Sequence, residues 1–177
     1  MIVWCYCGLA EAQEIDLVQE VNRLRADPAK YADLLKPRQA SAAVKEAIET
    51  LKRTPPRPEL EPAEALEAAA RDHVRDIGPK GLVQHKGRDG SQPVDRIARH
   101  GIKRTATAEV ISFGPSRARD VVIELVIDEG VKDRGHRKIL LDPDLRYAGA
   151  ACGPHKVYRT MCVIDFAGPT RAESRRR

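Results

Sequence analysis

Residues 133–140 read DRGHRKIL, and this is the most informative stretch of the sequence. It predicts a short helix that begins near Gly135 and is closed by Asp142-Pro143, because proline cannot continue a helix. The helix dipole disfavours a protonated histidine at a helix start. We therefore expect His136 to be a neutral imidazole that is available to bind a ligand.

The helix before this stretch is predicted from Arg117 to Glu129, with Ser116 as its N-cap and Gly130 at its end. Its last two residues, Asp128 and Glu129, are acidic, and acidic groups at a helix C-terminus oppose the helix dipole. A functional or tertiary partner for one of them would explain this placement. An ordinary solvated helix end is the alternative.

A hairpin is predicted after residue 140, from strands at 147–152 and 160–166 with a turn near Val157. In this register Cys152 and Cys162 face each other, at a separation where a disulfide can form. Closing so small a loop contributes roughly 2.5–3 kcal/mol in the chain-entropy model. The alternative is a pair of reduced, apolar core residues.

Two more candidate site residues lie upstream. His85 lies in the glycine-rich loop QHKGRDG at residues 84–90, where packing does not require a histidine. Glu109 lies in an apolar strand at 108–113, where a carboxylate is costly unless it is paired or binds a ligand. A solvated loop histidine and a solvent-facing glutamate are the alternatives. His73, on the buried face of a helix, is expected to be a hydrogen-bonded core residue.

The fold class follows from the order of the predicted elements. Apolar periodicity predicts helices at 14–25, just after Asp27-Pro28, at 40–51, at 62–77 and from Ser91 to Gly101, with a proline-rich connector at 54–58. One strand, one helix and the hairpin follow. We expect an α+β fold, a three-layer α-β-α sandwich with a small antiparallel sheet.

The composition is that of a globular domain, with 42% hydrophobic and 32% charged residues. The formal net charge is +5, and part of it comes from the arginines at 175–177. There is no nucleic-acid-binding motif, aromatic platform or basic helix stripe, so no nucleic-acid partner is expected. The longest apolar run, residues 1–10, is about half of what a transmembrane helix needs.

The chain divides into three predicted parts. Residues 1–13 are expected to be either a truncated signal peptide or a disordered extension, because a short apolar stretch is followed by small residues without a preceding positive region. Residues 14–168 form the single folded domain. Residues 169–177 form a basic disordered tail.

Taken in order, these segments resemble the CAP superfamily of cysteine-rich secretory, antigen 5 and pathogenesis-related proteins, in its bacterial SCP-like form. The resemblance covers roughly residues 14–168. It rests on the following pieces: VNRLR at 21–25 with Asp27-Pro28; Leu66 to Ile77 with His73; His85 before Gly87 and Gly90; Arg96-Ile97 before Gly101; Ala108-Glu109; DRGHRKIL at 133–140; Pro143, Gly149 and the closing strand at 163–166.

The resemblance implies a cleft lined by two histidines and two acids. By motif position these are His85, Glu109, Asp128 and His136, with Glu129 as the alternative to Asp128. It also implies a secreted protein that binds Zn²⁺ or another divalent cation, and a small-molecule, lipid or glycan ligand. The alternative function is a metal-dependent hydrolase, a protease or esterase, that uses the same cleft. The chain departs from the family pattern because it lacks the many disulfides of the eukaryotic members.

Overall fold

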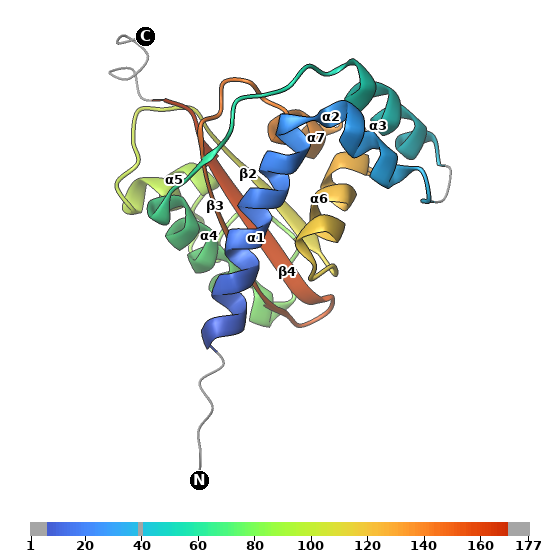
Figure 1. Ribbon diagram of the computed structural model, residues 1–177. Coiled ribbons are helices and arrows are strands. Elements are labelled where there is room, and N and C mark those ends of the chain that lie inside the picture. Colours follow the sequence, from blue (N-terminus) through green and yellow to red (C-terminus); the bar gives the residue numbers. More distant parts are fainter. Residues whose placement is uncertain (1–6, 39–40, 170–177) are drawn as a thin grey trace.

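The structure is a computed structural model that describes residues 7–38 and 41–169, with side chains from Leu17 onward (Figure 1). The helices are α1 (Cys7–Ala26), α2 (Pro28–Tyr31), η1 (Ala32–Leu35), α3 (Ala42–Arg53), α4 (Glu64–Ile77), η2 (Gly78–Lys80), α5 (Pro93–Arg99), α6 (Ala118–Ile127) and α7 (Gly135–Leu140). The strands are β1 (Glu61–Pro62), β2 (Thr107–Phe113), β3 (Tyr147–His155) and β4 (Arg159–Ala167).

The sheet has the strand order β1-β3-β4-β2. Both β2 and β3 pair with β4 in an antiparallel arrangement, as expected, whereas the short β1 runs parallel to β3. The turn of the hairpin lies at residues 156–158, where the sequence predicted it. The strand β2 therefore lies at one edge of the sheet.

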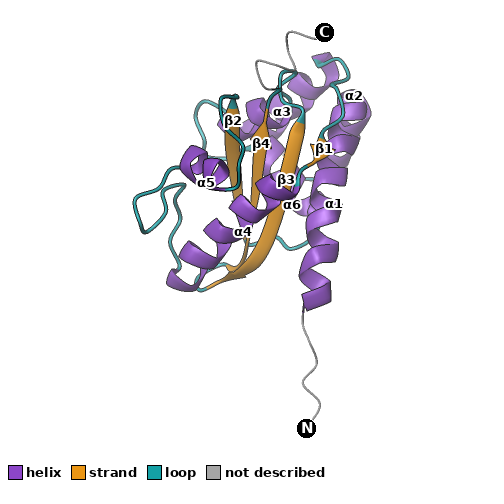
Figure 2. Cartoon of the chain, turned by 90° about the vertical axis from the view of Figure 1, so that its left-hand side faces the viewer, coloured by secondary structure: helices purple, strands orange, loops and turns teal. Residues whose placement is uncertain are grey.

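Helices cover both faces of the sheet, which confirms the three-layer sandwich. Figure 2 shows α4 and α5 on one side of the sheet and α1 on the other. Alternate residues of each strand supply the two cores. Val110 and Ile164 pack in a core with α1, α3 and α6, whereas Ile111 and Val163 pack against α4.

Two features fix the positions of helices in the outer layers. A Cβ on Gly149 of β3 would lie 2.1 Å from the backbone nitrogen of Glu67, so the absence of a side chain lets α4 lie directly on the strand. On the opposite face, the fully buried guanidinium of Arg25 donates hydrogen bonds to the backbone oxygens of Leu140 and Asp142 at 3.0 and 2.9 Å. Arg25 thus fixes the end of α7 against α1.

Some helix boundaries differ from the sequence prediction. The helix α1 begins at Cys7, whereas the apolar spacing predicted a helix only from residue 14; residues 1–6 lie outside the described residues. The predicted N-caps Ser116 and Ser91 were wrong. The N-cap of α6 is Arg117, without a side-chain hydrogen bond, and α5 uses Gln92 in a capping box with Asp95.

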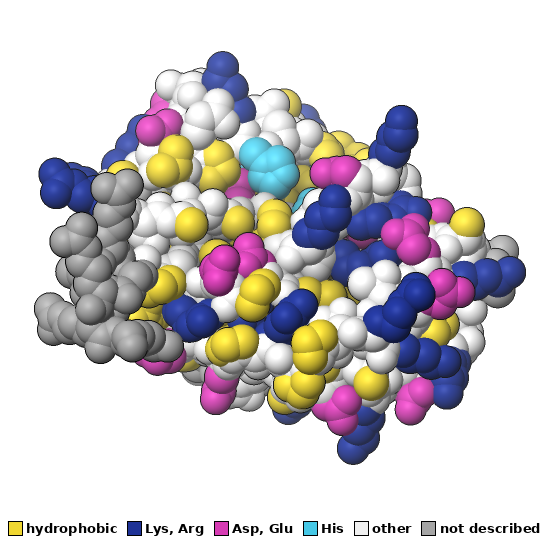
Figure 3. All heavy atoms as spheres, turned by 90° about the horizontal axis from the view of Figure 1, so that it is seen from above, with side chains coloured by type: hydrophobic (Ala, Val, Ile, Leu, Met, Phe, Trp, Pro, Cys, Tyr) yellow, Lys and Arg dark blue, Asp and Glu magenta, His cyan; other side chains and the backbone are white. Residues whose placement is uncertain are grey.

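The described surface has mixed charge. On the face shown in Figure 3, lysine and arginine side chains are interspersed with aspartate and glutamate. No helix within the described residues is long and apolar enough to cross a membrane. The basic tail predicted at 169–177 lies almost entirely outside the described residues.

Candidate functional site

A pocket of about 320 Å³ opens at the edge of the sheet, between the loop after η2, the strand β2 and the helices α6 and α7. Three of the sequence-predicted site residues, His85, Asp128 and His136, line it, and so does Glu129. The remaining lining residues are Val83, Gln84, Ile111, Phe113, Glu124, Leu125 and Val131. The structure therefore brings both histidines to one pocket from segments about fifty residues apart in the sequence.

Glu109 lies behind His85. Its Oε1 accepts a hydrogen bond from Nδ1 of His85 at 2.7 Å, and its Oε2 accepts one from the buried guanidinium of Arg96 at 2.6 Å. Burial by itself would raise the pKa of Glu109, but these hydrogen bonds and the charge of Arg96 bring it below its usual value. Glu109 is thus an ionised anchor for a half-exposed imidazole.

Asp128 makes the matching pair on the other side of the pocket. It ends α6 as a C-cap in the left-handed conformation, with φ 56°, which asparagine and aspartate tolerate better than most residues. Its carboxylate accepts hydrogen bonds from the backbone N–H of His136 at 2.9 Å and from Nδ1 of the same residue at 2.7 Å. The acid therefore stabilises the start of α7, where the helix dipole favours it.

The two acids at the end of α6 have different roles. Asp128 is buried, with 3% of its surface exposed, and binds His136. Glu129 is exposed at the pocket rim, and its Oε2 accepts a hydrogen bond from Ser41. Asp128 is therefore the partner of His136.

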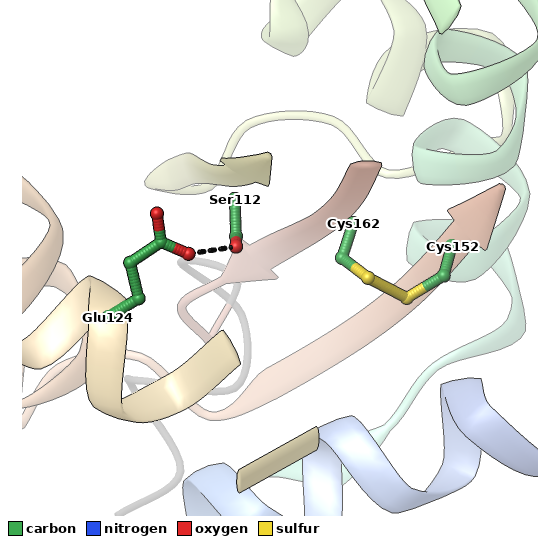
Figure 4. Close-up of a disulfide and its surroundings, with 4 residues drawn as sticks. All are labelled: Ser112, Glu124, Cys152 and Cys162. Carbon is green, nitrogen blue, oxygen red and sulfur yellow. Dashed lines mark hydrogen bonds between the residues drawn. A yellow bond between two sulfur atoms is a disulfide. The ribbon is translucent and has the colours of Figure 1, made fainter. Parts of the chain in front are cut away.

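Glu124 is a pocket residue that the sequence analysis missed. It projects from α6 toward β2, where its Oε2 accepts a hydrogen bond of 2.6 Å from Ser112 (Figure 4). Partial desolvation raises the pKa of Glu124 above its usual value, and the Ser112 hydrogen bond and the charge of His136, when that ring is protonated, oppose that rise only in part. The available signal was a single acid inside the apolar helical run VVIELVI at 121–127.

A second missed acid lies deeper, beneath Glu109. Asp165 of β4 is directly opposite Glu109 in the sheet and is fully buried. No donor among the described residues bonds to either of its carboxyl oxygens. Burial and the neighbouring charge of Glu109 raise the pKa of Asp165 well above its usual value. His73, predicted as a core residue, is buried nearby, with Nε2 3.0 Å from the backbone oxygen of Gln84.

The disulfide predicted between Cys152 and Cys162 is present. The two residues are directly opposite each other on β3 and β4, and Ser112 is the partner of Cys162 on β2. Figure 4 shows the disulfide and the Ser112–Glu124 pair on the same stretch of sheet. The bond thus joins two strands close to the pocket wall.

The donor set fits a metal ion only in part. Within residues 7–38 and 41–169, no three His, Cys, Asp or Glu side chains are arranged to hold a metal. The oxygens of Glu109 and Asp128 are occupied by Nδ1 of the imidazoles and by other donors. Of the four predicted ligands, His85 and His136 each keep Nε2, and no described group forms a hydrogen bond to either Nε2 atom. The expectation that all four residues bind one ion stays a prediction.

Comparison with models of known protein families identifies the family of this chain. The model of the cysteine-rich secretory protein family, CAP, matches residues 18–166. The chain belongs to the CAP family. The resemblance seen in the sequence is thereby confirmed.

Solved structures show the same fold. An outer surface protein from Borrelia burgdorferi superposes with a TM-score of 0.56 at 17% identity, over 89% of this chain and 98% of that one. An extracellular SCP-domain protein from Bacillus anthracis gives a TM-score of 0.60 at 14% identity, over 96% of this CAP chain and 45% of the other. This CAP domain thus spans less than half of the Bacillus protein. No curated protein sequence matches the chain.

Proposed function

We propose that this CAP-domain protein acts outside the cell and binds a divalent metal ion in the pocket through His85 and His136. The observation that carries the proposal is the repeated contact between Nδ1 and a carboxylate, 2.7 Å in both pairs. A carboxylate can only accept at this contact, so each neutral imidazole carries its proton on Nδ1. The lone pair is then on Nε2, as in the carboxylate–histidine–metal arrangement of known metal sites.

The other pocket residues would determine which ligand binds next to the metal ion. Two imidazoles leave open coordination positions for water or a ligand. Val83, Ile111 and Phe113 supply apolar contact surface next to them. This combination suits a small-molecule, lipid or glycan ligand with one polar group near the histidines and an apolar part along the wall.

Two observations support an extracellular location. The chain contains a disulfide between Cys152 and Cys162, a bond that persists in oxidising compartments. The two structural relatives named above are described as an outer surface protein and an extracellular protein.

The test is zinc titration by calorimetry on the full chain. We expect roughly micromolar or tighter binding by the wild type and none by the variant with His85→Ala and His136→Ala. His100→Ala is the matched control, because His100 pairs with Asp72 outside the pocket. Unchanged binding in the double variant, or no binding in the wild type, would refute the proposal.

The hydrolase alternative rests on the same carboxylate–imidazole pairs. An imidazole held by a carboxylate can act as a general base toward water. No Ser, Thr or Cys is among the described residues that line the pocket, so water would be the nucleophile. A panel of peptides and esters should then be hydrolysed by the wild type and more slowly by Glu109→Gln; no turnover above that variant argues against the alternative.

A further inference from the structure

The strand β2 presents unpaired backbone groups on its outer edge. Hydrogen bonds from Gly168 N to the Ala106 oxygen and from Gly114 N to the Thr160 oxygen flank its ladder with β4. Antiparallel pairs alternate between bonded and non-bonded residues. The even-numbered residues 108–112 therefore bond to β4, and the odd-numbered residues direct their N–H and C=O groups away from the sheet.

Two of the three residues with outward backbone groups line the pocket. Glu109, Ile111 and Phe113 carry them, and none of the described residues forms a hydrogen bond to their backbone. Ile111 and Phe113 also line the pocket. A sheet edge with free donors and acceptors is the template on which extended peptides add as a further strand.

The two sides of this edge differ in chemistry. On the α4 side are Val83, which is 57% exposed, and Phe113, whose ring packs 5.7 Å from that of the half-exposed Tyr158. On the α6 side are the carboxylates of Glu124 and Glu129. No lysine or arginine lines the pocket among the described residues.

We propose that a short extended peptide with alternating apolar and basic side chains adds antiparallel to the outer edge of β2. Side chains of an added strand alternate between the two sides. Residues opposite Ile111 and Phe113 bond to β2 and place apolar side chains toward Val83. The residues between them direct basic side chains toward Glu124 and Glu129.

This inference deepens the proposed binding function of the pocket and does not require the metal ion. A second copy of the chain is a poorer occupant, because pairing two β2 edges would bring the acidic α6 sides of both pockets together. We expect the peptide to add antiparallel to β2, because antiparallel strand pairing is more stable per residue than parallel pairing.

The test is amide hydrogen exchange on the full, isotope-labelled chain in the presence of EDTA. The probe is a capped peptide of alternating valine and lysine, and the control peptide has glutamate in place of lysine. We expect slower exchange at Ile111 and Phe113 with the lysine peptide, and a roughly tenfold larger Kd for the glutamate peptide. Unchanged exchange at both amides overturns the proposal.

Methylated peptides test the backbone pairing itself. In the proposed register the valine amides bond to β2 and the lysine amides face outward. Methylation of the valine amides should abolish binding, whereas methylation of the lysine amides should preserve it. Equal binding of the valine-methylated and unmodified peptides overturns strand addition.

Protein variants test the charge preference. The variant with Glu124→Gln and Glu129→Gln should bind the lysine and glutamate peptides almost equally, while Glu49→Gln on α3 should discriminate like the wild type. If the double variant still prefers the lysine peptide as strongly as the wild type does, Glu124 and Glu129 are not the source of the charge preference. Zinc calorimetry distinguishes the failure of one proposal from the failure of the other. Peptide binding without zinc binding refutes only the metal site, and zinc binding without peptide binding refutes only strand addition.

Discussion

Asp128→Asn would test whether this side chain sets the tautomer of His136. The carboxylate accepts hydrogen bonds of 2.7 Å from Nδ1 and 2.9 Å from the backbone N–H of that histidine. Asparagine tolerates the left-handed conformation at φ 56°, so the backbone should be preserved. Its oxygen can keep the backbone N–H, but its amide group then faces Nδ1 and must donate to it. The ring proton moves to Nε2.

The expected magnitudes follow from the contacts that change. One buried, charge-assisted hydrogen bond becomes a neutral one of reversed polarity, which should lower the free energy of unfolding by about 1–2 kcal/mol. Zinc affinity should fall by about 10–100-fold, the usual effect of losing an orienting partner behind a metal-binding histidine. Urea denaturation, zinc calorimetry and nitrogen NMR of the His136 ring measure the three quantities.

Glu129→Gln is the matched control, because it changes the neighbouring acid, which bonds to Ser41 and not to His136. It should leave the ring tautomer unchanged. The reasoning is refuted if Asp128→Asn keeps the proton on Nδ1, or if it binds zinc as tightly as the wild type.

Three further predictions concern the scaffold. Asp165→Asn should become more stable relative to the wild type as the pH rises. The raised pKa of Asp165 lets the folded wild type retain a proton that the unfolded chain releases above the ordinary carboxyl range, so the wild type loses stability as the pH rises. The difference in the free energy of unfolding between the two proteins should vanish toward about pH 4, and parallel plots of unfolding free energy against pH would contradict this. Replacing Cys152 and Cys162 together with alanine should lower the free energy of unfolding by roughly 2.5–3 kcal/mol, measured against an oxidised wild type in urea, and a loss near zero would show that loop closure does not act here. Gly149→Ala should cost about 3 kcal/mol or prevent folding, because its Cβ would overlap the backbone of Glu67; Gly101→Ala, with open space around its Cβ but a φ of 96°, is a control for backbone strain alone.

Much of the fold was predictable from local pattern. The apolar spacing in α4, from Leu66 to Ile77, follows one helix face because that face packs on the sheet. The hairpin and its disulfide were predictable from the position of the turn. A short turn sets the antiparallel register, so residues at equal sequence separation from the turn are paired. Cys152 and Cys162 are equally far from Val157 in the sequence and are paired. Helix starts were less predictable, since Ser116 and Ser91 are good N-caps by residue type that the chain does not use.

The sequence by itself therefore determined the family, the α-β-α layering and the identity of His85, Glu109 and His136 as candidates. Local signals of helix, strand and turn act over a few residues and survive without tertiary context. The choice of Asp128 over Glu129, the inclusion of Glu124 and the burial of Asp165 beneath Glu109 were decided only by the tertiary structure. Each depends on how separate segments pack against one another in the fold, and no local residue spacing encodes that packing.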